Sequence, residues 1–103
     1  MITMTIDSVP GKQLEVVGLV KGNVVRAKHI GRDIMAGFKT LVGGEIAGYT
    51  ELLSEAREIA TERMVKDAQR LGADAIVGMR YITCSVMDGA SEVTAYGTAV
   101  KFV

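Results

Sequence analysis

The residues with the clearest chemical potential are one thiol and one imidazole, Cys84 and His29. Thiolate and imidazole are the ligands that soft metals such as zinc and copper prefer, usually in tetrahedral sites. A single chain cannot complete such a site, so a metal centre would have to combine Cys84 and His29 from several copies. The structural alternative is that Cys84, in strand parity with Ile82 and Val86, is a small buried hydrophobic residue.

A second polar cluster precedes and begins a predicted short helix, where free backbone amides and basic side chains can hold a phosphate or carboxylate. The same residues also have ordinary structural roles, because Asp33 suits a helix start and Arg32 can pair with a neighbouring carboxylate. Gly43 and Gly44 do not form a phosphate loop, since the Lys and Ser or Thr that should follow are missing. The ligand-binding candidates are Arg32, Asp33, Glu45 and Tyr49.

Catalytic motifs are absent from the sequence. His29 is the only imidazole available as a base, and no Gly-x-Ser-x-Gly elbow occurs. Glu58 and Glu62 fall on the outward face of a predicted helix, which favours a solvated role over acid-base catalysis. We therefore predict no catalytic residue and identify no cofactor. The alternative is a small hydrolase or isomerase with an inter-subunit site around His29, Arg32 and Asp33.

The first half of the chain predicts two strands and a short helix. Apolar residues alternate with threonines from Ile2 to Ile6, which is typical of a half-buried strand. Valines on both faces predict a long strand over Gln13–Ala27, bent near Gly22 and Asn23. Apolar residues at near-helical spacing predict a short helix over Ile30–Leu41.

The second half predicts a long helix and a hairpin. Apolar residues recur every three or four positions over Tyr49–Leu71, with acids early and bases late on the outer ridge, and Gly72 suits the end of the helix. Strands are expected over Ala75–Val86 and Glu92–Val103, joined by a turn that contains Asp88 and Gly89. One face of the last strand is small enough for a helix to approach closely, since it carries Val93, Ala95, Gly97 and Ala99.

Both strands of this hairpin are apolar on both faces, and one long helix can cover only one face of a sheet. The uncovered face would form an apolar patch of the kind that marks interaction surfaces, so we expect association with further copies of the chain. Between Lys12 and Lys39 basic residues outnumber acidic ones six to two, whereas the long helix begins with acids. A head-to-tail assembly can pair these regions, although a solvated helix face explains the acids equally well.

Length and composition limit the protein class. A chain of 103 residues is long enough for one modest core, so we predict a single domain over residues 1–103. Twelve basic and twelve acidic residues give no net charge at neutral pH, which argues against nucleic-acid and anionic-membrane partners. The single cysteine favours a reducing compartment, and no segment has the length of a spanning helix, so we expect a soluble cytoplasmic protein.

Three blocks of sequence resemble the YbjQ-like family, often labelled a heavy-metal-binding domain although its members are functionally uncharacterised. The blocks are GRDIMAGFKTLVGGE at 31–45, YTELLSEAREIATERM at 49–64, and LGADAIVG with EVTAYGTAV in the final third. The resemblance implies an α+β fold: a mostly antiparallel sheet with one long and one short helix packed against one face. It also implies a dodecin-like subunit that assembles into a closed homo-oligomeric ring, a pentamer. We expect a binding or scaffolding module whose ligand or metal, if any, lies between subunits.

Overall fold

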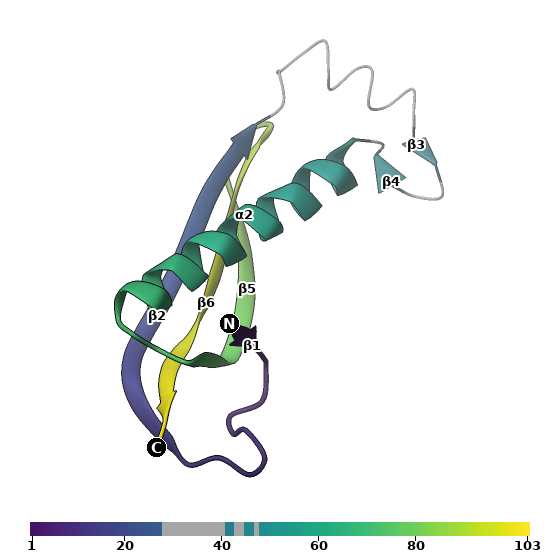
Figure 1. Cartoon of the computed structure of the whole chain (residues 1–103). Helices are drawn as coiled ribbons and strands as arrows, with labels where there is room; N and C mark the ends of the chain where they lie inside the picture. Colours follow the sequence, from purple (N-terminus) through teal and green to yellow (C-terminus); the bar gives the residue numbers. More distant parts are fainter. Residues whose placement is uncertain (28–40, 43–44, 47) are drawn as a thin grey trace.

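The computed structural model describes residues 1–27, 41–42, 45–46 and 48–103 of the chain. Three long strands form a curved sheet, and one long helix lies across it (Figure 1). The elements in chain order are β1 (Ile2–Thr3), β2 (Leu14–Ala27), β3 (Leu41–Val42), β4 (Glu45–Ile46), α2 (Tyr49–Arg70), β5 (Ala75–Met87) and β6 (Ala90–Phe102). The α+β class predicted from the sequence is confirmed.

The main sheet has four strands in the order β1-β5-β6-β2, and β3 and β4 form a separate two-stranded ladder. β5 and β2 both pair antiparallel with the central strand β6, whereas the short β1 pairs parallel with β5. The sheet is therefore mixed, and the expected mostly antiparallel sheet describes only its three long strands. β6 has partners on both sides. The edges of the sheet are therefore the outer side of β2 and the outer side of β5 beyond its pairing with β1; we call this part of β5 its upper part.

α2 covers one face of the sheet, which we call the helix face. The helix buries a stripe at helical spacing, Ala56, Ala60, Met64 and Ala68, against β2 and β6. The strands meet it with small or branched residues, among them Val20, Val93, Ala95 and Ala99. Gly22 lies directly under the helix, because a Cβ there would overlap the backbone at Ala60 and Met64. Small residues on both elements thus allow the close packing that the sequence predicted.

The opposite face of the sheet, the far face, is covered only at the end nearest the two termini. Ala75, Val77 and Val100 are buried there. Residues of the N-terminal segment and of the strand ends pack over them, namely Met4, Val9, Leu14 and Phe102. Hydrogen bonds from Met4 to Ile76, and from Gly78 and Met79 back to this segment, hold it beside β5. The N-terminal segment therefore does on the far face what α2 does on the helix face, but over a shorter length.

Several predicted elements differ from the structure. The first strand is only Ile2–Thr3, because the chain then crosses β5 with irregular hydrogen bonds. The register irregularity of β2 falls between Val16 and Gly18, not near Gly22, whose role is to admit the helix. Leu41 belongs to β3, so the predicted short helix cannot include it, and the rest of that prediction lies outside the described residues.

The long helix and the hairpin follow the prediction closely. α2 begins at Tyr49 and ends at Arg70, and Gly72 with its positive φ of 75° follows it. The hairpin connection is shorter than expected, since β5 extends to Met87 and β6 begins at Ala90. Gly89 takes the positive φ that this tight turn needs. Among the described helices, none has the length and apolar character to cross a membrane.

Candidate functional site

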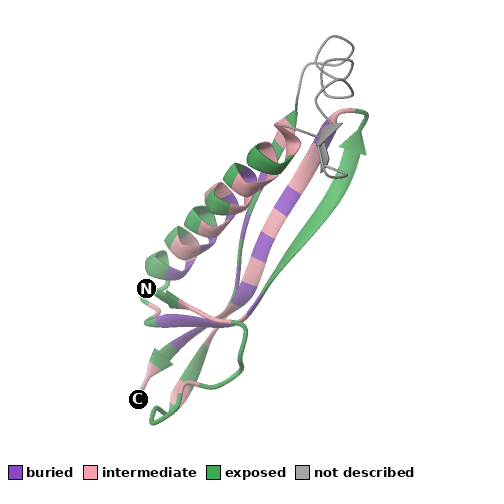
Figure 2. Ribbon diagram, turned by 90° about the vertical axis from the view of Figure 1, so that its right-hand side faces the viewer, coloured by how far each residue is buried: buried purple, intermediate pink, exposed green. Residues whose placement is uncertain are grey.

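The upper part of β5 is exposed on both faces. All eight residues from Arg80 to Met87 are exposed, whereas the neighbouring β6 alternates between buried and half-buried positions (Figure 2). Large apolar side chains lie in this segment, with exposed fractions of 45% for Tyr81, 48% for Ile82, 52% for Val86 and 62% for Met87. Within the described residues, no strand pairs with the outer side of this segment. It is an open, apolar strand edge of the kind that soluble proteins normally cover.

The far face continues this exposed surface toward β2. The register places Ile82 and Cys84 of β5 on this face together with Leu19 and Val25 of β2. Leu19 is 69% exposed and Val25 54% exposed, and Cys84 is also exposed. The N-terminal segment that covers the lower far face does not reach these residues. The exposed edge is thus continuous with an upper far face of mixed character, because the register places Glu92 of β6 between Val25 and Cys84.

One groove lies between α2 and the open edge of β5, and we call it the β5 groove. It encloses about 560 Å³ and is lined by Ser54, Arg57, Glu58, Thr61, Glu62 and Tyr81. The hydroxyls of Thr61 and Tyr81 are 2.6 Å apart, so a hydrogen bond ties the helix to β5. Arg57 donates to the Ser54 hydroxyl at 3.1 Å. Two carboxylates against one guanidinium give this groove a slight acidic excess.

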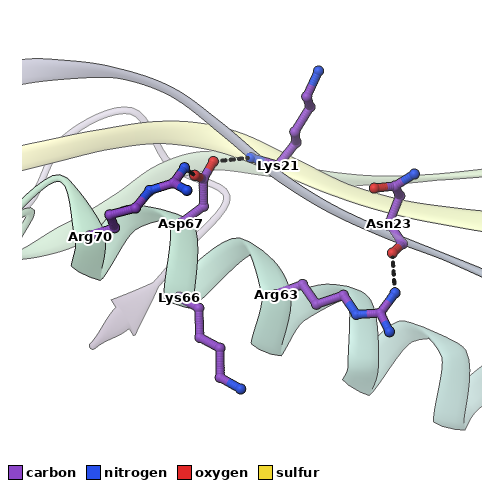
Figure 3. Close-up of a pocket in the computed structure, with 6 residues that line it drawn as sticks. All are labelled: Lys21, Asn23, Arg63, Lys66, Asp67 and Arg70. Atoms are coloured by element: carbon purple, nitrogen blue, oxygen red, sulfur yellow. Dashed lines mark hydrogen bonds and ion pairs between the residues drawn. The ribbon is translucent and has the colours of Figure 1, made fainter.

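A second groove lies on the other side of α2, beside β2, and we call it the β2 groove (Figure 3). It encloses about 470 Å³ and is lined by Lys21, Asn23, Arg63, Lys66, Asp67 and Arg70. Four basic residues against one carboxylate give it a basic excess, and the Lys21 side chain points away from α2. Figure 3 shows that Lys21 and Lys66 point away from each other, so these charges surround the groove without converging on one point. This arrangement suits an extended acidic surface better than a single small anion.

Two helix side chains in the β2 groove hold the outer edge of β2. Arg63 donates to the Asn23 carbonyl at 2.7 Å, and the Lys21 N–H donates to Asp67 at 3.4 Å. Asp67 also pairs with Arg70. Side chains that occupy edge N–H and C=O groups block another strand from pairing at those positions. The sequence analysis missed this role because helix periodicity shows that Arg63 and Asp67 point outward, but not which strand edge they meet.

The predicted metal residues have separate outcomes. Cys84 is a free thiol on the exposed part of β5, so the interpretation of a buried hydrophobic residue is wrong for the single chain. Its parity with Ile82 is correct, but the face on which both residues lie is uncovered there. His29 lies outside the described residues. Across the part of the chain that the structure describes, no group of three or more Cys, His, Asp or Glu residues could hold a metal ion.

The predicted ligand-binding residues are only partly placed. Tyr49 is the first residue of α2, and Glu45 belongs to β4, which packs against that helix. Arg32 and Asp33 lie outside the described residues. Tyr49 lines neither of the two grooves. Tyr81, by contrast, lines the β5 groove.

The expected charge complementarity is partly satisfied inside one chain. Arg26 of β2 pairs with Glu55 of α2 at 2.8 Å, and Lys66 lies 4.0 Å from Glu62 along the helix. These exposed pairs contribute little to stability. Glu58 and the basic residues Lys21 and Arg63 make no ion pair among the described residues that would cancel the grooves' charges. Opposite charge therefore remains available on the two sides of α2.

Comparison with known proteins identifies relatives over the whole chain. A family model described as "Putative heavy-metal-binding" matches residues 1–103. A UPF0145 protein of Vibrio parahaemolyticus is 62% identical over 104 aligned residues that cover 100% of this chain and 99% of the relative. A UPF0145 protein of Thermotoga maritima is 61% identical, with 98% of this chain and 96% of the relative covered.

A solved structure shares the fold. The crystal structure of a protein of unknown function from Pediococcus pentosaceus, assigned to a DUF74 family, has a TM-score of 0.67 to this chain. The superposition covers 100% of this chain and 98% of the other, at 20% sequence identity. At that identity the likeness concerns the fold alone.

Proposed function

Because the chain belongs to the YbjQ-like family, also named UPF0145, we propose that it acts as a homo-oligomeric binding or scaffolding module without catalytic activity. In this proposal any ligand is bound between subunits, where the exposed β5 edge and the upper far face of one copy meet another copy. The resemblance suggests a closed pentameric ring of dodecin-like subunits. The single cysteine favours a reducing compartment, so we assign the protein to the cytoplasm.

The observation that carries this proposal is the exposed apolar surface of β5. Tyr81, Ile82, Val86 and Met87 lie in the part of β5 beyond its pairing with β1, where no described strand pairs with its outer side. Burying one such side chain contributes roughly 1.5 to 3 kcal/mol, so several of them can offset much of the cost of association. A second copy of the chain is the simplest partner to cover this surface, because it needs no other molecule to be present.

The dimensions of the chain support the same conclusion. Its radius of gyration is 16.9 Å, and it extends over 54 × 25 × 16 Å. A compact domain of this length has a radius of gyration of roughly 13 Å. The long hairpin and helix therefore extend beyond what one small core can cover, which is typical of subunits that complete their core by assembly.

Native mass spectrometry of protein purified without an affinity tag tests the proposal. We expect a single dominant species at micromolar concentration whose mass is a whole multiple of the 11.0 kDa chain. A stable, folded species of single-chain mass would overturn the proposal. A multiple other than the pentamer would keep the function and correct the ring size.

A second candidate function, soft-metal binding, is favoured by the exposure of the Cys84 thiol. An exposed thiol is accessible to a metal, and assembly can bring several copies of Cys84 together. The same mass spectra, recorded after addition of zinc or copper, test this function. Metal retained by the wild type and lost in Cys84→Ala supports it, with Thr83→Ala as the matched control. Equal retention by the wild type and Cys84→Ala counts against it.

A further inference from the structure

Among the residues that the structure describes, two strand edges without a strand partner flank the same part of β6. Thr83–Met87 of β5 lies on one side of it, and Val24–Ala27 of β2 lies on the other. Cys84 and Val25, for example, both pair with Glu92. The free segment of β2 begins at Val24 because helix side chains occupy the backbone groups of the residues below it. The two free edges therefore lie at the same height in the sheet.

The two edges also point in the same direction. β2 and β5 are each antiparallel to β6, so they are parallel to each other. A second copy, rotated about an axis parallel to the strands, would bring its β2 edge beside the β5 edge of the first without a shift along the strand. Parallel strands pair through evenly spaced backbone hydrogen bonds, and strand addition of this kind is a common mode of protein association.

The charges beside the two edges are opposite. The β5 groove carries Glu58 and Glu62 against Arg57, whereas the β2 groove has four basic side chains against Asp67. Each groove lies between α2 and one of the open edges, so edge pairing would bring the two grooves toward each other. Two different surfaces that match in this way form a head-to-tail contact, which can close into a ring.

We propose that β5 of one copy adds in parallel to β2 of a second copy, Thr83–Met87 beside Val24–Ala27, with the acidic β5 groove facing the basic β2 groove. This inference rests on the proposed homo-oligomer and specifies its interface. A second copy fits better than an unrelated peptide because one chain carries both matching edges and both charges. The contact covers the backbone of the open β5 segment and the apolar side chains next to it.

Charge reversal tests the interface. The first variant, Glu58→Lys with Glu62→Lys, reverses the acidic side, and the second, Lys21→Glu with Lys66→Glu, reverses the basic side. The third combines all four changes. Glu15→Lys with Lys101→Glu is the matched control, because these exposed residues pair across β2 and β6 far from both grooves. Light scattering gives the mass of the assembly and hence the number of subunits, and circular dichroism confirms that each variant is folded.

On dilution, each two-residue variant should dissociate at a protein concentration at least about tenfold higher than the concentration at which the wild type dissociates. We expect this because attraction becomes repulsion across the interface. The four-residue variant should recover assembly, and the control should match the wild type. Assembly that resists both reversals, or dissociation that the four-residue variant does not reverse, would overturn the proposed interface. A wild-type monomer would instead overturn the homo-oligomer itself, so the two failures are distinguishable.

Discussion

Gly22 is the residue on which the packing of α2 most directly depends. It is buried in β2, and a Cβ at this position would overlap the Ala60 carbonyl oxygen and the Met64 amide nitrogen. Backbone atoms cannot move aside as a flexible side chain can, so the helix would have to shift as a whole. We expect Gly22→Ala to reduce the free energy of unfolding by about 1 to 3 kcal/mol. Urea denaturation followed by circular dichroism measures this change.

Glu15→Ala, in the same strand, is the control for this prediction. The Glu15 side chain is exposed, and it lines neither of the two grooves. Its free energy of unfolding should stay within about 0.5 kcal/mol of the wild type. If Gly22→Ala behaved like this control, the close approach of helix and strand at this point would be disproved.

Cys84 and Gly22 show how far sequence patterns determine the role of a single residue. The alternation along β5 correctly assigned Cys84 to the face that Ile82 occupies. Burial of that face depends on which other segment covers it, and the N-terminal segment ends its cover lower down. Gly22 was assigned to a bend because glycine in a strand has that meaning more often than close helix approach. In both cases the missing information was a tertiary contact.

At the scale of elements, the two sides of the hairpin should respond differently to proline. Backbone N–H groups alternate between the two sides of a strand. The Lys21 N–H of β2 meets Asp67 of α2 and so points away from β6, which means that the Val24 N–H points toward β6 and its partner Val93. Val93 therefore directs its backbone groups toward β2, and the Thr83 N–H, opposite Val93 on the other side, points to the outer side of β5. Thr83→Pro should therefore preserve the fold, at a cost of about 1 kcal/mol or less, and weaken association.

Thr94→Pro provides the contrast. Thr94 lies in the central strand β6, paired with Asn23 on one side and Ile82 on the other. Proline there removes a ladder hydrogen bond and should prevent folding. Circular dichroism and light scattering separate the two effects. A Thr83→Pro variant that assembles as well as the wild type would show that the β5 edge is not used.

The elements differ in how well local patterns predict them. The helix Tyr49–Arg70 was predicted to within one residue because its apolar stripe and following glycine are local signals. The hairpin strands were also found, since the Asp88–Gly89 turn marks where they reverse. The parallel pairing of Ile2–Thr3 with β5 was missed, because it joins segments separated by most of the chain. The grooves beside α2 were missed because they form only where the helix packs against strands, and a local pattern does not show that packing.

At the scale of the whole molecule, the apolar surface of one chain and its elongated form have a thermodynamic consequence. If copies cover the edge and far face of one another, the folded state gains stability by mass action, and the melting temperature rises with protein concentration. We expect a hundredfold dilution from high micromolar concentration to lower the melting temperature by several degrees, because the subunits separate before they unfold. Differential scanning fluorimetry measures this shift directly. Thr83→Pro, already dissociated, should melt at a temperature that does not change with concentration. A wild type that also melts independently of concentration would mean that one chain stabilises its long hairpin alone, and the exposed residues of β5 would then need no partner.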